Sequence, residues 1–256
     1  MLGNWVIDNI IAMYDSYIEA KNQENFQNRY EGKEEYYHGS ASGSCARKLY
    51  YQVAQAPESN PMNDATKRKL RLGTIFHSEM EDCVNYYVNS TGTLELTGTK
   101  SLGDFSILKV TQEQEIVIPS VNVRGFFDLL VETTDNELIL IDYKTIASYP
   151  YKLKFGKNSK PSTNLRYELQ MGTYGYAIRE KYGRLDGMYL LYYNKDDSRM
   201  THVSVPLKYL DIAYQYWKLI NNLHAQGIPP IDHGVSPVED WECRYCNYSD
   251  LCKGKV

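Results

Sequence analysis

Apolar residues recur at every third or fourth position between Lys67 and Val88, and this spacing predicts an amphipathic helix. Such a helix presents one apolar stripe to the rest of the fold. The same periodicity, interrupted by segments that contain Gly and Pro, predicts four further helices. The stripe consists of Leu72, Phe76, Met80, Cys83 or Val84, and Tyr87, and the other predicted helices span residues 4–20, 47–55, 165–182 and 207–226.

The middle of the chain changes to the pattern of strands. Between residues 94 and 143 several runs are rich in β-branched and aromatic residues, and the last two are VNVRGFFDLLVE and ELILIDYKT. They flank Thr133–Asn136, which has turn-forming composition, so they predict an antiparallel hairpin. Further strands are predicted at residues 187–194 and 200–205, and the segment from Pro229 is expected to be irregular. Helices and strands that share one core predict an α/β domain.

Composition places the chain among globular proteins. Its 256 residues are 43% hydrophobic and 23% charged, which is typical of a domain with one well-buried core. No apolar run approaches the roughly 18 residues of a membrane-spanning helix, so no membrane association is expected. The N-terminal residues lack the basic region of a secretory signal, and we expect a cytoplasmic protein.

The basic residues are clustered. A net charge of −4 speaks against a protein that simply coats nucleic acid, but the local distribution of charge matters more than the sum. Residues 143–167 contain no Asp or Glu, and residues 67–71 hold four basic side chains ahead of the predicted helix. Either cluster could form a solvated surface or contact a nucleic-acid backbone. The clusters comprise Lys144, Lys152, Lys154, Lys157, Lys160 and Arg166, and Lys67, Arg68, Lys69 and Arg71.

The tripeptide Asp142-Tyr143-Lys144 ends a predicted buried strand. Residues i and i+2 of a strand share a face, so its carboxylate and ammonium project side by side. An Asp-x-Lys alone is common by chance and is usually a surface salt bridge. If the hairpin turn centres near Asp135, however, Asp128 comes roughly opposite Asp142. Two carboxylates at one place repel each other unless a cation lies between them.

A histidine adds to this group. His77 lies at the edge of the inward face of the helix at residues 67–88, beside Phe76 and Met80. A lone histidine there is usually a packed core residue, but two carboxylates and a lysine within reach make it a candidate metal ligand. Hard oxygen ligands favour Mg²⁺ or Mn²⁺ over Zn²⁺.

Four short motifs occur in a fixed order along the chain. They are GTIFH (Gly73–His77), GFFD (Gly125–Asp128), DYK (Asp142–Lys144) and QMGTY (Gln170–Tyr174). In this order they resemble the RecB-type branch of the PD-(D/E)xK nucleases, and the order is specific where each motif alone is weak. The resemblance covers residues 73–174. It implies a restriction-endonuclease-like core, in which helices flank a mixed sheet.

The resemblance also implies how the site works. His77, Asp128 and Asp142 are expected to ligate Mg²⁺ or Mn²⁺, with the carbonyl of Tyr143 as a further ligand. The metal would lower the pKa of a bound water and polarise the phosphodiester that this water attacks. Lys144 would orient the water and offset the charge that develops on the phosphate oxygens.

Two further motif residues and one basic segment are candidates for contact with DNA. Gln170 and Tyr174 are i and i+4 on one helix face, so both could reach DNA, although they also suit an ordinary helix-edge pair. Residues 152–166, which include Pro161, are expected to form a flexible segment that lines the DNA entry.

The five cysteines are odd in number and the chain is not small and loop-rich, so a disulfide scaffold is not expected. Cys243, Cys246 and Cys252 lie in one segment and Cys45 lies far upstream, a pattern that fits the two close ligand pairs of structural zinc poorly. It is similar to the iron–sulfur arrangement of AddB-type and CRISPR-associated RecB-like nucleases. The resemblance implies that these four residues bind a 4Fe–4S cluster joining the N- and C-terminal segments, with zinc or free thiols as alternatives. Cys83, on the apolar stripe of the helix at residues 67–88, is expected to be a buried packing residue.

These expectations describe a single nuclease domain over residues 1–256. It has a helical segment with the first cluster cysteine (1–66), a nuclease core (67–206), and a C-terminal helix with the Cys-rich segment (207–256). The expected function is a metal-dependent DNA exonuclease that acts on single-stranded DNA or free DNA ends. The alternatives are a catalytically silent DNA-end-binding adaptor and an endonuclease or flap nuclease.

The resemblance alone implies the biological context of the protein. It implies a bacterial, archaeal or phage-infected host cell and protein partners in DNA repair, recombination or CRISPR adaptation. The chain has no G-x-x-x-x-G-K-(S/T) motif, which excludes an ATP-driven helicase within it.

Overall fold

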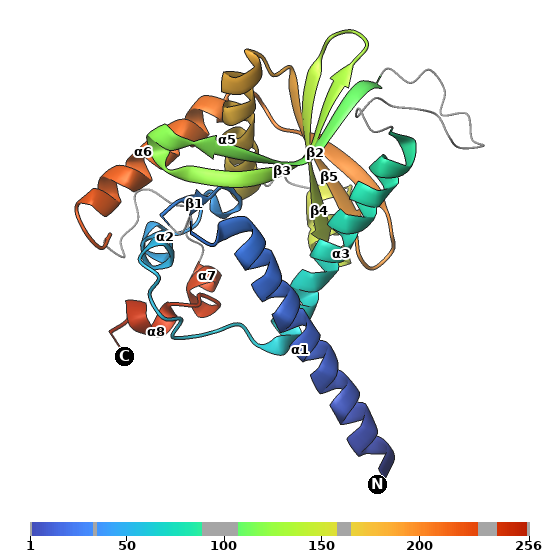
Figure 1. The fold of residues 1–256 in the computed structure, drawn as a ribbon, viewed down its shortest axis with the longest axis vertical. Helices are drawn as coiled ribbons and strands as arrows, with labels where there is room; N and C mark the ends of the chain where they lie inside the picture. The colour runs from blue at the N-terminus through green and yellow to red at the C-terminus, as the bar shows by residue number, and fades with distance from the viewer. Residues whose placement is uncertain (1, 33–34, 89–106, 158–164, 230–239, 255–256) are drawn as a thin grey trace.

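A computed structural model describes residues 2–32, 35–88, 107–157, 165–229 and 240–254. At its centre is one six-stranded sheet in the order β1-β3-β4-β5-β6, with β2 also paired to β3 (Figure 1). The strands are β1 (Tyr37–His38), β2 (Ile107–Ile118), β3 (Val123–Thr133), β4 (Leu138–Ile146), β5 (Gly187–Asn194) and β6 (Met200–Ser204).

Helices lie on both faces of the sheet, which confirms the predicted α/β class. On one face α5 and α6 cover the larger core, and α3 runs across the other face over a smaller apolar cluster (Figure 1). The helices are α1 (Leu2–Tyr30), α2 (Ala46–Val53), α3 (Asp64–Tyr87), α4 (Ser148–Phe155), α5 (Leu165–Tyr182), α6 (Tyr209–Ala225), α7 (Asp240–Arg244) and α8 (Ser249–Cys252), with 3₁₀ turns at Gly39–Ala41 and Pro119–Val121.

The predicted hairpin of β3 and β4 is confirmed. The two strands are antiparallel, and their turn closes through the hydrogen bond from the N–H of Asn136 to the carbonyl of Thr133. β5 then pairs with β4 in parallel after the α5 crossover, and this gives the mixed sheet.

β2 and β3 exchange faces partway along their length. In β3, Phe127 packs in the larger core under α5 and α6, whereas Leu129 packs in the cluster under α3. In β2, Ile116 and Val110 are divided in the same way. Residues an even number apart normally share a face, so the two-stranded ribbon must twist between these positions.

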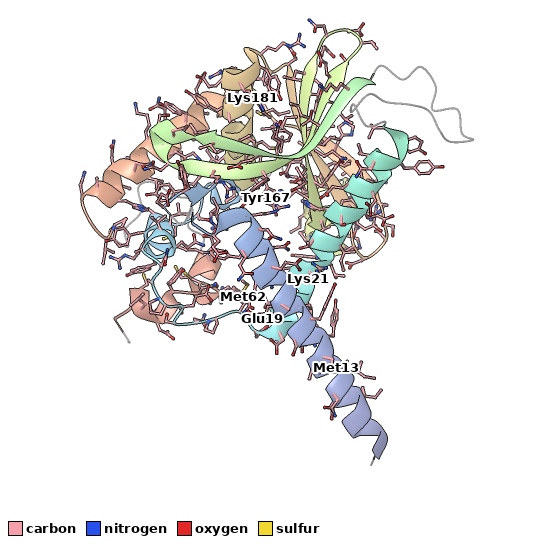
Figure 2. All side chains as sticks on the ribbon, viewed as in Figure 1. Met13, Glu19, Lys21, Met62, Tyr167 and Lys181 are labelled. Atoms are coloured by element: carbon pink, nitrogen blue, oxygen red, sulfur yellow. The ribbon has the colours of Figure 1, made fainter. Side chains whose placement is uncertain are left out.

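α1 is longer than the predicted helix at residues 4–20. The residues added at its C-terminal end, 21–30, contain neither Gly nor Pro, and Lys21 pairs with Glu24 at 2.6 Å on the helix surface. α1 projects beyond the body of the fold, and Met13 points into solvent with 70% of its surface exposed (Figure 2).

The basic cluster at residues 67–71 lies inside α3 rather than ahead of it, because the helix begins at Asp64. Asn63 caps this helix start by accepting a hydrogen bond from the N–H of Thr66. Lys67 lies 2.8 Å from Glu19 and Arg68 lies 3.4 Å from Asp15, so two of the four cations fasten α1 to α3.

Two segments differ from their predicted irregular structure. Residues 152–155, expected to be flexible, belong to α4, and residues 158–164 lie outside the described part of the chain. The segment after Pro229 contains the short helices α7 and α8. These helices pack beside α2, with the ring centroids of Tyr51 and Tyr248 5.5 Å apart. In the segment after α2, the N–H of Asn60 donates to the carbonyl of Asn247 at 2.8 Å. Within the described residues, no helix has both the length and the apolar character needed to cross a membrane.

Candidate metal and active site

The site lies where β3 separates from β4. Their antiparallel ladder ends at Leu129 and Ile141, and the next residues are Asp128 and Asp142. Asp128 Oδ2 accepts a hydrogen bond of 2.6 Å from the backbone N–H of Tyr143, which ties the carboxylate to the diverging strand. The hairpin therefore brings both carboxylates to one place, as its sequence predicts.

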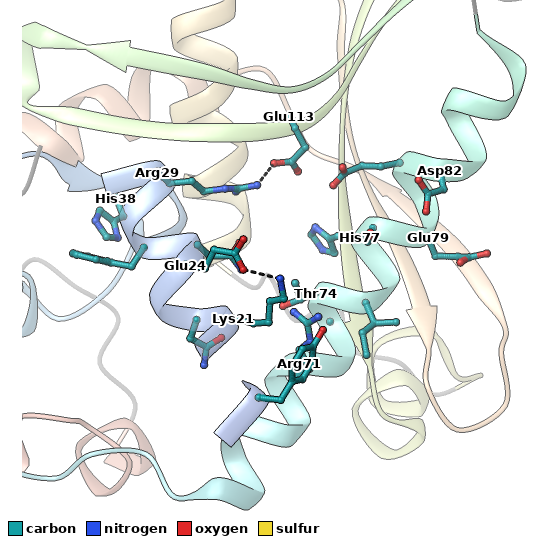
Figure 3. Close-up of a pocket in the computed structure, with 18 residues that line it drawn as sticks. Lys21, Glu24, Arg29, His38, Arg71, Thr74, His77, Glu79, Asp82 and Glu113 are labelled. Carbon is teal, nitrogen blue, oxygen red and sulfur yellow. Dashed lines mark hydrogen bonds and ion pairs between the residues drawn. The ribbon is translucent and has the colours of Figure 1, made fainter. Parts of the chain in front are cut away.

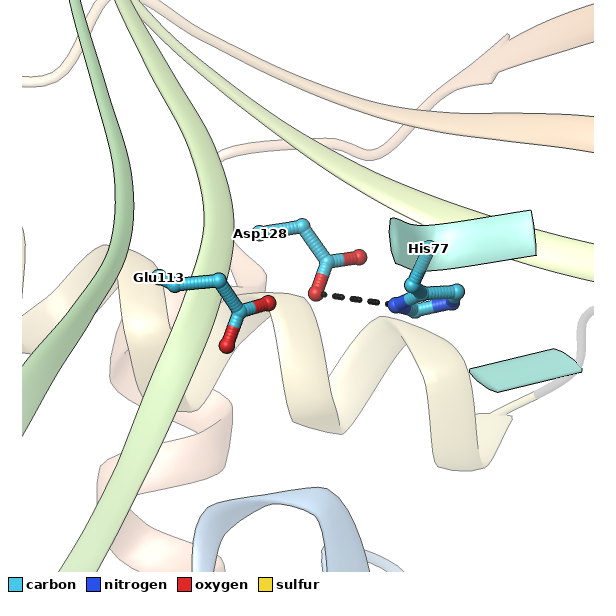
Figure 4. A group of neighbouring side chains, drawn as sticks. All are labelled: His77, Glu113 and Asp128. Carbon is cyan, nitrogen blue, oxygen red and sulfur yellow. Dashed lines mark ion pairs between the residues drawn. The ribbon is translucent and has the colours of Figure 1, made fainter. Parts of the chain in front are cut away.

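α3 contributes His77 from the other side of the site. Its Nδ1 lies 3.4 Å from Asp128 Oδ1 (Figure 4). The preceding residue, Phe76, stacks on Tyr193 with ring centroids 4.6 Å apart and holds this turn of the helix against the sheet. Burial alone would lower the pKa of His77. The adjacent Asp128 carboxylate raises this pKa by more than burial lowers it, so the net change is upward.

Asp142 and Lys144 face α5. Lys144 Nζ lies 2.5 Å from Asp142 Oδ2 and 5.0 Å from the centre of the Tyr167 ring. Gln170 Nε2 donates to Asp142 Oδ1 at 3.1 Å and approaches the Tyr174 hydroxyl at 3.4 Å. The DYK and QMGTY motifs thus meet through side chains, although they come from a strand and a separate helix.

The electrostatics of this group suit a cation. Asp142 is only 1% exposed, and burial raises its pKa to about 6, with Lys144 opposing the rise and Asp128 adding to it. Burial lowers the pKa of Lys144, but the attraction of Asp142 and Asp128 outweighs it and the net change is upward. Buried carboxylates that repel each other are stabilised by a bound cation, so the donor set fits Mg²⁺ or Mn²⁺.

The structure adds one residue that the motifs do not contain. Glu113 of β2 lies opposite Asp128 of β3, since the flanking pairs are Gln112–Leu129 and Gln114–Phe127. One ligand atom each from His77, Glu113 and Asp128 lie within 4.8 Å of one another (Figure 4). The sequence carries no motif for Glu113, because its position depends on how β2 pairs with β3.

A cavity of about 940 Å³ opens beside His77 and Glu113, between α1 and α3 (Figure 3). Side chains of both charges line it, and Figure 3 shows Arg29 directed toward Glu113 across the space and Lys21 paired with Glu24. The carboxylates are those of Glu24, Glu79, Glu81, Asp82 and Glu113. The cations are Lys21 and Arg29 of α1 and Arg71 of α3.

Tyr174 is placed behind the site and is only 2% exposed. Its ring lies against two glycines, because a Cβ added at Gly39 or Gly125 would come within 2.6 or 2.9 Å of Tyr174 Cε1. This contact gives the glycine of the GFFD motif a packing role. Gln170 reaches the site itself, and direct contact of either residue with DNA stays a prediction.

The four cysteines predicted to bind a cluster line one small cavity of about 180 Å³ between α2 and the C-terminal helices. Arg47 Nη1 lies 3.7 Å from Cys252 Sγ, and the N–H of Tyr248 donates to Cys246 Sγ at 3.5 Å. Burial raises the pKa of the Cys243 thiol, and the neighbouring cysteines act in the same direction. The cavity is lined by Cys45, Cys243, Cys246 and Cys252 together with Arg47, Lys48, Arg166 and Lys253.

In the described part of the chain, no three of the cysteines form a group that could hold one metal ion as they stand. The binding of a metal or cluster by these residues stays a prediction.

Cys83 is exposed, which corrects the expectation that it is buried. Phe76, Met80 and Val84 form the packed side of α3 instead.

The model of the PD-(D/E)XK nuclease superfamily matches residues 88–253 of the chain. No curated protein matches significantly. The solved structure of SSO0001 is 17% identical, with a TM-score of 0.57, and the match covers 95% of this chain and 98% of that one. A putative exonuclease from Eubacterium rectale is 14% identical, with a TM-score of 0.50 and coverage of 91% and 92%. An alkaline exonuclease from Laribacter hongkongensis is 18% identical, with a TM-score of 0.44 and coverage of 77% and 92%.

Proposed function

The chain belongs to the PD-(D/E)XK nuclease superfamily, and we propose that it is a metal-dependent deoxyribonuclease acting as an exonuclease on single-stranded DNA or free DNA ends. The observation that carries this proposal is the convergence of Asp128 of β3 with Asp142 and Lys144 of β4 at one site. Metal-dependent hydrolysis uses two carboxylates and a lysine together, whereas a module that only binds DNA does not require Lys144 to lie 2.5 Å from the buried carboxylate of Asp142.

His77, Asp128 and Asp142, with the carbonyl of Tyr143, would hold Mg²⁺ or Mn²⁺. Such an ion supplies a water of lowered pKa and polarises the phosphoryl oxygen. The ligands are fixed by their neighbours, because the N–H of Tyr143 orients Asp128. In the same way, the amide of Gln170 orients Asp142.

Lys144 supplies the positive charge of the site. Its stem is held in the protein, since the side chain is 14% exposed, and its ammonium lies over the Tyr167 ring. A fixed charge costs little reorganisation when the phosphate oxygens gain negative charge in the transition state. Lys144 would therefore orient the attacking water and stabilise that charge.

The cavity between α1 and α3 supports DNA as the substrate. It reaches the proposed metal ligand His77, and Arg71 on its wall can contact a phosphate, whereas Lys21 and Arg29 are paired with Glu24 and Glu113 of the same cavity. The structures of SSO0001 and of the Eubacterium rectale protein are below 25% identical to this chain and support the fold alone, so the choice of an exonuclease rests on the resemblance of the motifs.

We further propose a 4Fe–4S cluster at Cys45, Cys243, Cys246 and Cys252. The four cysteines line one cavity, and arginine and lysine side chains beside them offset the charge of thiolate ligands. The cluster would join α2 to the C-terminal helices. The same proposal includes a relationship to the AddB-type and CRISPR-associated RecB-like nucleases. It also includes protein partners in DNA repair, recombination or CRISPR adaptation.

End-labelled linear DNA and circular single-stranded DNA test the proposed activity. Wild-type protein with Mn²⁺ should shorten labelled single strands from an end and leave the circle intact, and EDTA should stop the reaction. Cutting of the circle would establish an endonuclease instead, and tight binding without cutting would establish an adaptor. Asp142→Asn should be inactive, whereas Asp211→Asn, which changes an exposed carboxylate of α6, should match the wild type.

A further inference from the structure

Glu113 places a third carboxylate beside the proposed metal ligands. Its ligand atom, that of His77 and that of Asp128 all lie within 4.8 Å of one another. Oxygens on opposite sides of one Mg²⁺ are about 4.2 Å apart, since each bond is about 2.1 Å long. Small side-chain movements would let one ion contact all three residues.

The backbone at Glu113 is unusual for a residue with a side chain. Its φ angle is +46°, in the left-handed region, although β2 pairs regularly with β3 on both sides of it. Glu113 and Asp128 lie opposite each other at the point where both strands exchange faces. Backbone conformations of this kind persist where the surrounding structure enforces them, and they are concentrated at functional sites.

Arg29 holds the Glu113 carboxylate from α1. Arg29 Nη2 donates to Glu113 Oε2 at 2.7 Å, and the guanidinium lies 4.8 Å from the centre of the Phe126 ring (Figure 3). This contact crosses the cavity and links the long N-terminal helix to the site. A bond to one carboxylate oxygen leaves the other available to a cation, as in metal sites whose ligands are oriented by neighbouring side chains.

We propose that Glu113 is a further metal-ligating residue of this site and that Arg29 is the residue that positions it. The proposal rests on the proposed function, because it assumes that Asp128 binds the catalytic cation. It differs from the motif-based ligand set in adding a carboxylate from β2 and in making α1 part of the metal site. Three carboxylates around one histidine favour a hard divalent cation.

The ligand role is tested without DNA or catalysis by measuring the binding of Mn²⁺ alone. Titration calorimetry is done on the full chain with the metal or cluster of its four cysteines in place. Glu113→Gln preserves shape but removes the charge, and it should weaken Mn²⁺ binding by about tenfold or more. Glu132→Gln is the matched control, since Glu132 lies on β3 and is also paired to an arginine, Arg184 at 3.4 Å. It should bind Mn²⁺ as the wild type does.

Asp128→Asn separates this inference from the proposed function. If Asp128→Asn loses Mn²⁺ binding and Glu113→Gln binds within twofold of the wild type, the role of Glu113 is wrong and the proposed active site stands. If Asp128→Asn also binds normally, the metal site itself is wrong and the inference falls with it. Thermal unfolding of each variant shows that it is folded under the titration conditions.

The positioning role of Arg29 is tested by combining substitutions. Arg29→Met should change the Mn²⁺ affinity of the wild type but have no further effect in the Glu113→Gln background, because its action passes through Glu113. Arg184→Met should have no effect in either background. An equal effect of Arg29→Met in both backgrounds would show that Arg29 acts through the general charge of the cavity.

Discussion

Asp128 accepts a hydrogen bond of 2.6 Å from the backbone N–H of Tyr143, across the opening where β3 and β4 part. Backbone pairing between the two strands ends at Leu129 and Ile141, next to Asp128 and Asp142. Beyond that pair, the bond to the Asp128 side chain connects the two strands. It uses Oδ2 of the carboxylate and leaves Oδ1 toward His77, at 3.4 Å. The divergence of β3 from β4 therefore has two effects. It opens room for the site, and it frees the N–H of Tyr143 to orient the carboxylate of Asp128.

Lys144→Ala is expected to reduce the turnover of single-stranded DNA by about 10²–10³, the scale of losing one well-placed electrostatic group. The affinity for DNA should barely change, because one buried lysine adds little to ground-state binding. Single-turnover cleavage and equilibrium binding to labelled DNA measure the two effects separately. Equal turnover by wild type and Lys144→Ala would reveal a contaminating nuclease.

The three proposed ligands should differ in how severely their loss affects activity. Asp142→Ala should abolish cleavage, and excess Mn²⁺ should rescue it poorly, because the substitution removes a buried anionic ligand. His77→Ala should retain more activity, since imidazole is less suited than carboxylate to a hard cation. Rates measured across a Mn²⁺ titration give this order, and a more active Asp142→Ala would contradict it.

The proposed 4Fe–4S cluster predicts an iron-containing protein. Protein purified without oxygen should be brown and carry roughly four irons per chain. Cys45→Ala should lose the iron and much of the soluble fold, whereas Cys83→Ala should keep both, because Cys83 is exposed on α3 away from that cavity. Metal analysis and visible absorbance make the comparison, and a colourless wild type with stoichiometric zinc would contradict the cluster.

The sequence predicts the parts of the site that depend on local periodicity. The alternation and turn around Thr133–Asn136 predict that Asp128 approaches Asp142, and the helical spacing predicts that His77 lies at an inward edge. Both placements are found in the structure. They depend on the pairing of neighbouring strands and on one amphipathic helix, which are strongly encoded in hydrophobic patterns.

The remainder depends on tertiary structure. Glu113 lacks a motif because a twist in the ribbon of β2 and β3, rather than its neighbours in sequence, carries it to the site. Cys83 fits the periodic stripe, yet it falls at the exposed margin because the packed stripe is narrow. α1 extends to Tyr30 through a polar segment that has no apolar periodicity but is bound to β2 by the ion pair of Arg29 with Glu113.

α4 and the two residues after it offer a test of how DNA is held. Charge reversal at Lys152 and Lys157, both exposed, should weaken DNA binding and reduce the slope of log K against log salt concentration by about 0.7–0.9 for each phosphate that is no longer neutralised. Lys154 is half-buried over the Tyr192 ring, at 5.4 Å, and is left unchanged. Lys208→Glu with Lys218→Glu, at the start and within α6, is the control. An unchanged slope in the Lys152 and Lys157 variant would mean that these lysines are merely solvated.

His224 predicts a pH dependence of stability. Its Nε2 donates to the carbonyl of Ala46 at 2.8 Å, so its Nδ1 accepts from the Tyr37 hydroxyl when the ring is neutral. Burial lowers the pKa of His224 in the folded protein, with the Ala46 bond opposing this shift. The unfolded state therefore binds a proton first, and the free energy of unfolding should fall as pH drops below about 6.5.

The comparison of wild type with His224→Gln isolates this effect. Glutamine can still donate to Ala46 but does not titrate, so the stability difference between the two proteins should change between about pH 7.5 and 5. Denaturant unfolding at a series of pH values measures it. A constant difference would show that other groups cause the acid sensitivity.

Two helix glycines should respond to alanine in opposite ways. A Cβ at Gly172 would lie 2.1 Å from the backbone oxygen of Tyr209, where α5 and α6 touch, so Gly172→Ala should destabilise the fold by about 1–3 kcal/mol or more. A Cβ at Gly73 would meet only Thr145 Oγ1, at 3.5 Å. Gly73→Ala should therefore stabilise α3 by about 1 kcal/mol, the usual preference for alanine within a helix.

The same Gly73→Ala substitution should impair the enzyme that it stabilises. Gly73 lines the cavity between α1 and α3, one helical turn before His77, and its neighbour Thr145 follows Lys144 directly. A methyl group there takes space that a DNA strand would need to reach the site, so the KM for DNA should rise while the unfolding temperature also rises. Mn²⁺ affinity should stay at the wild-type value, because no ligand moves. A stabilised variant with unchanged KM would place the DNA path elsewhere.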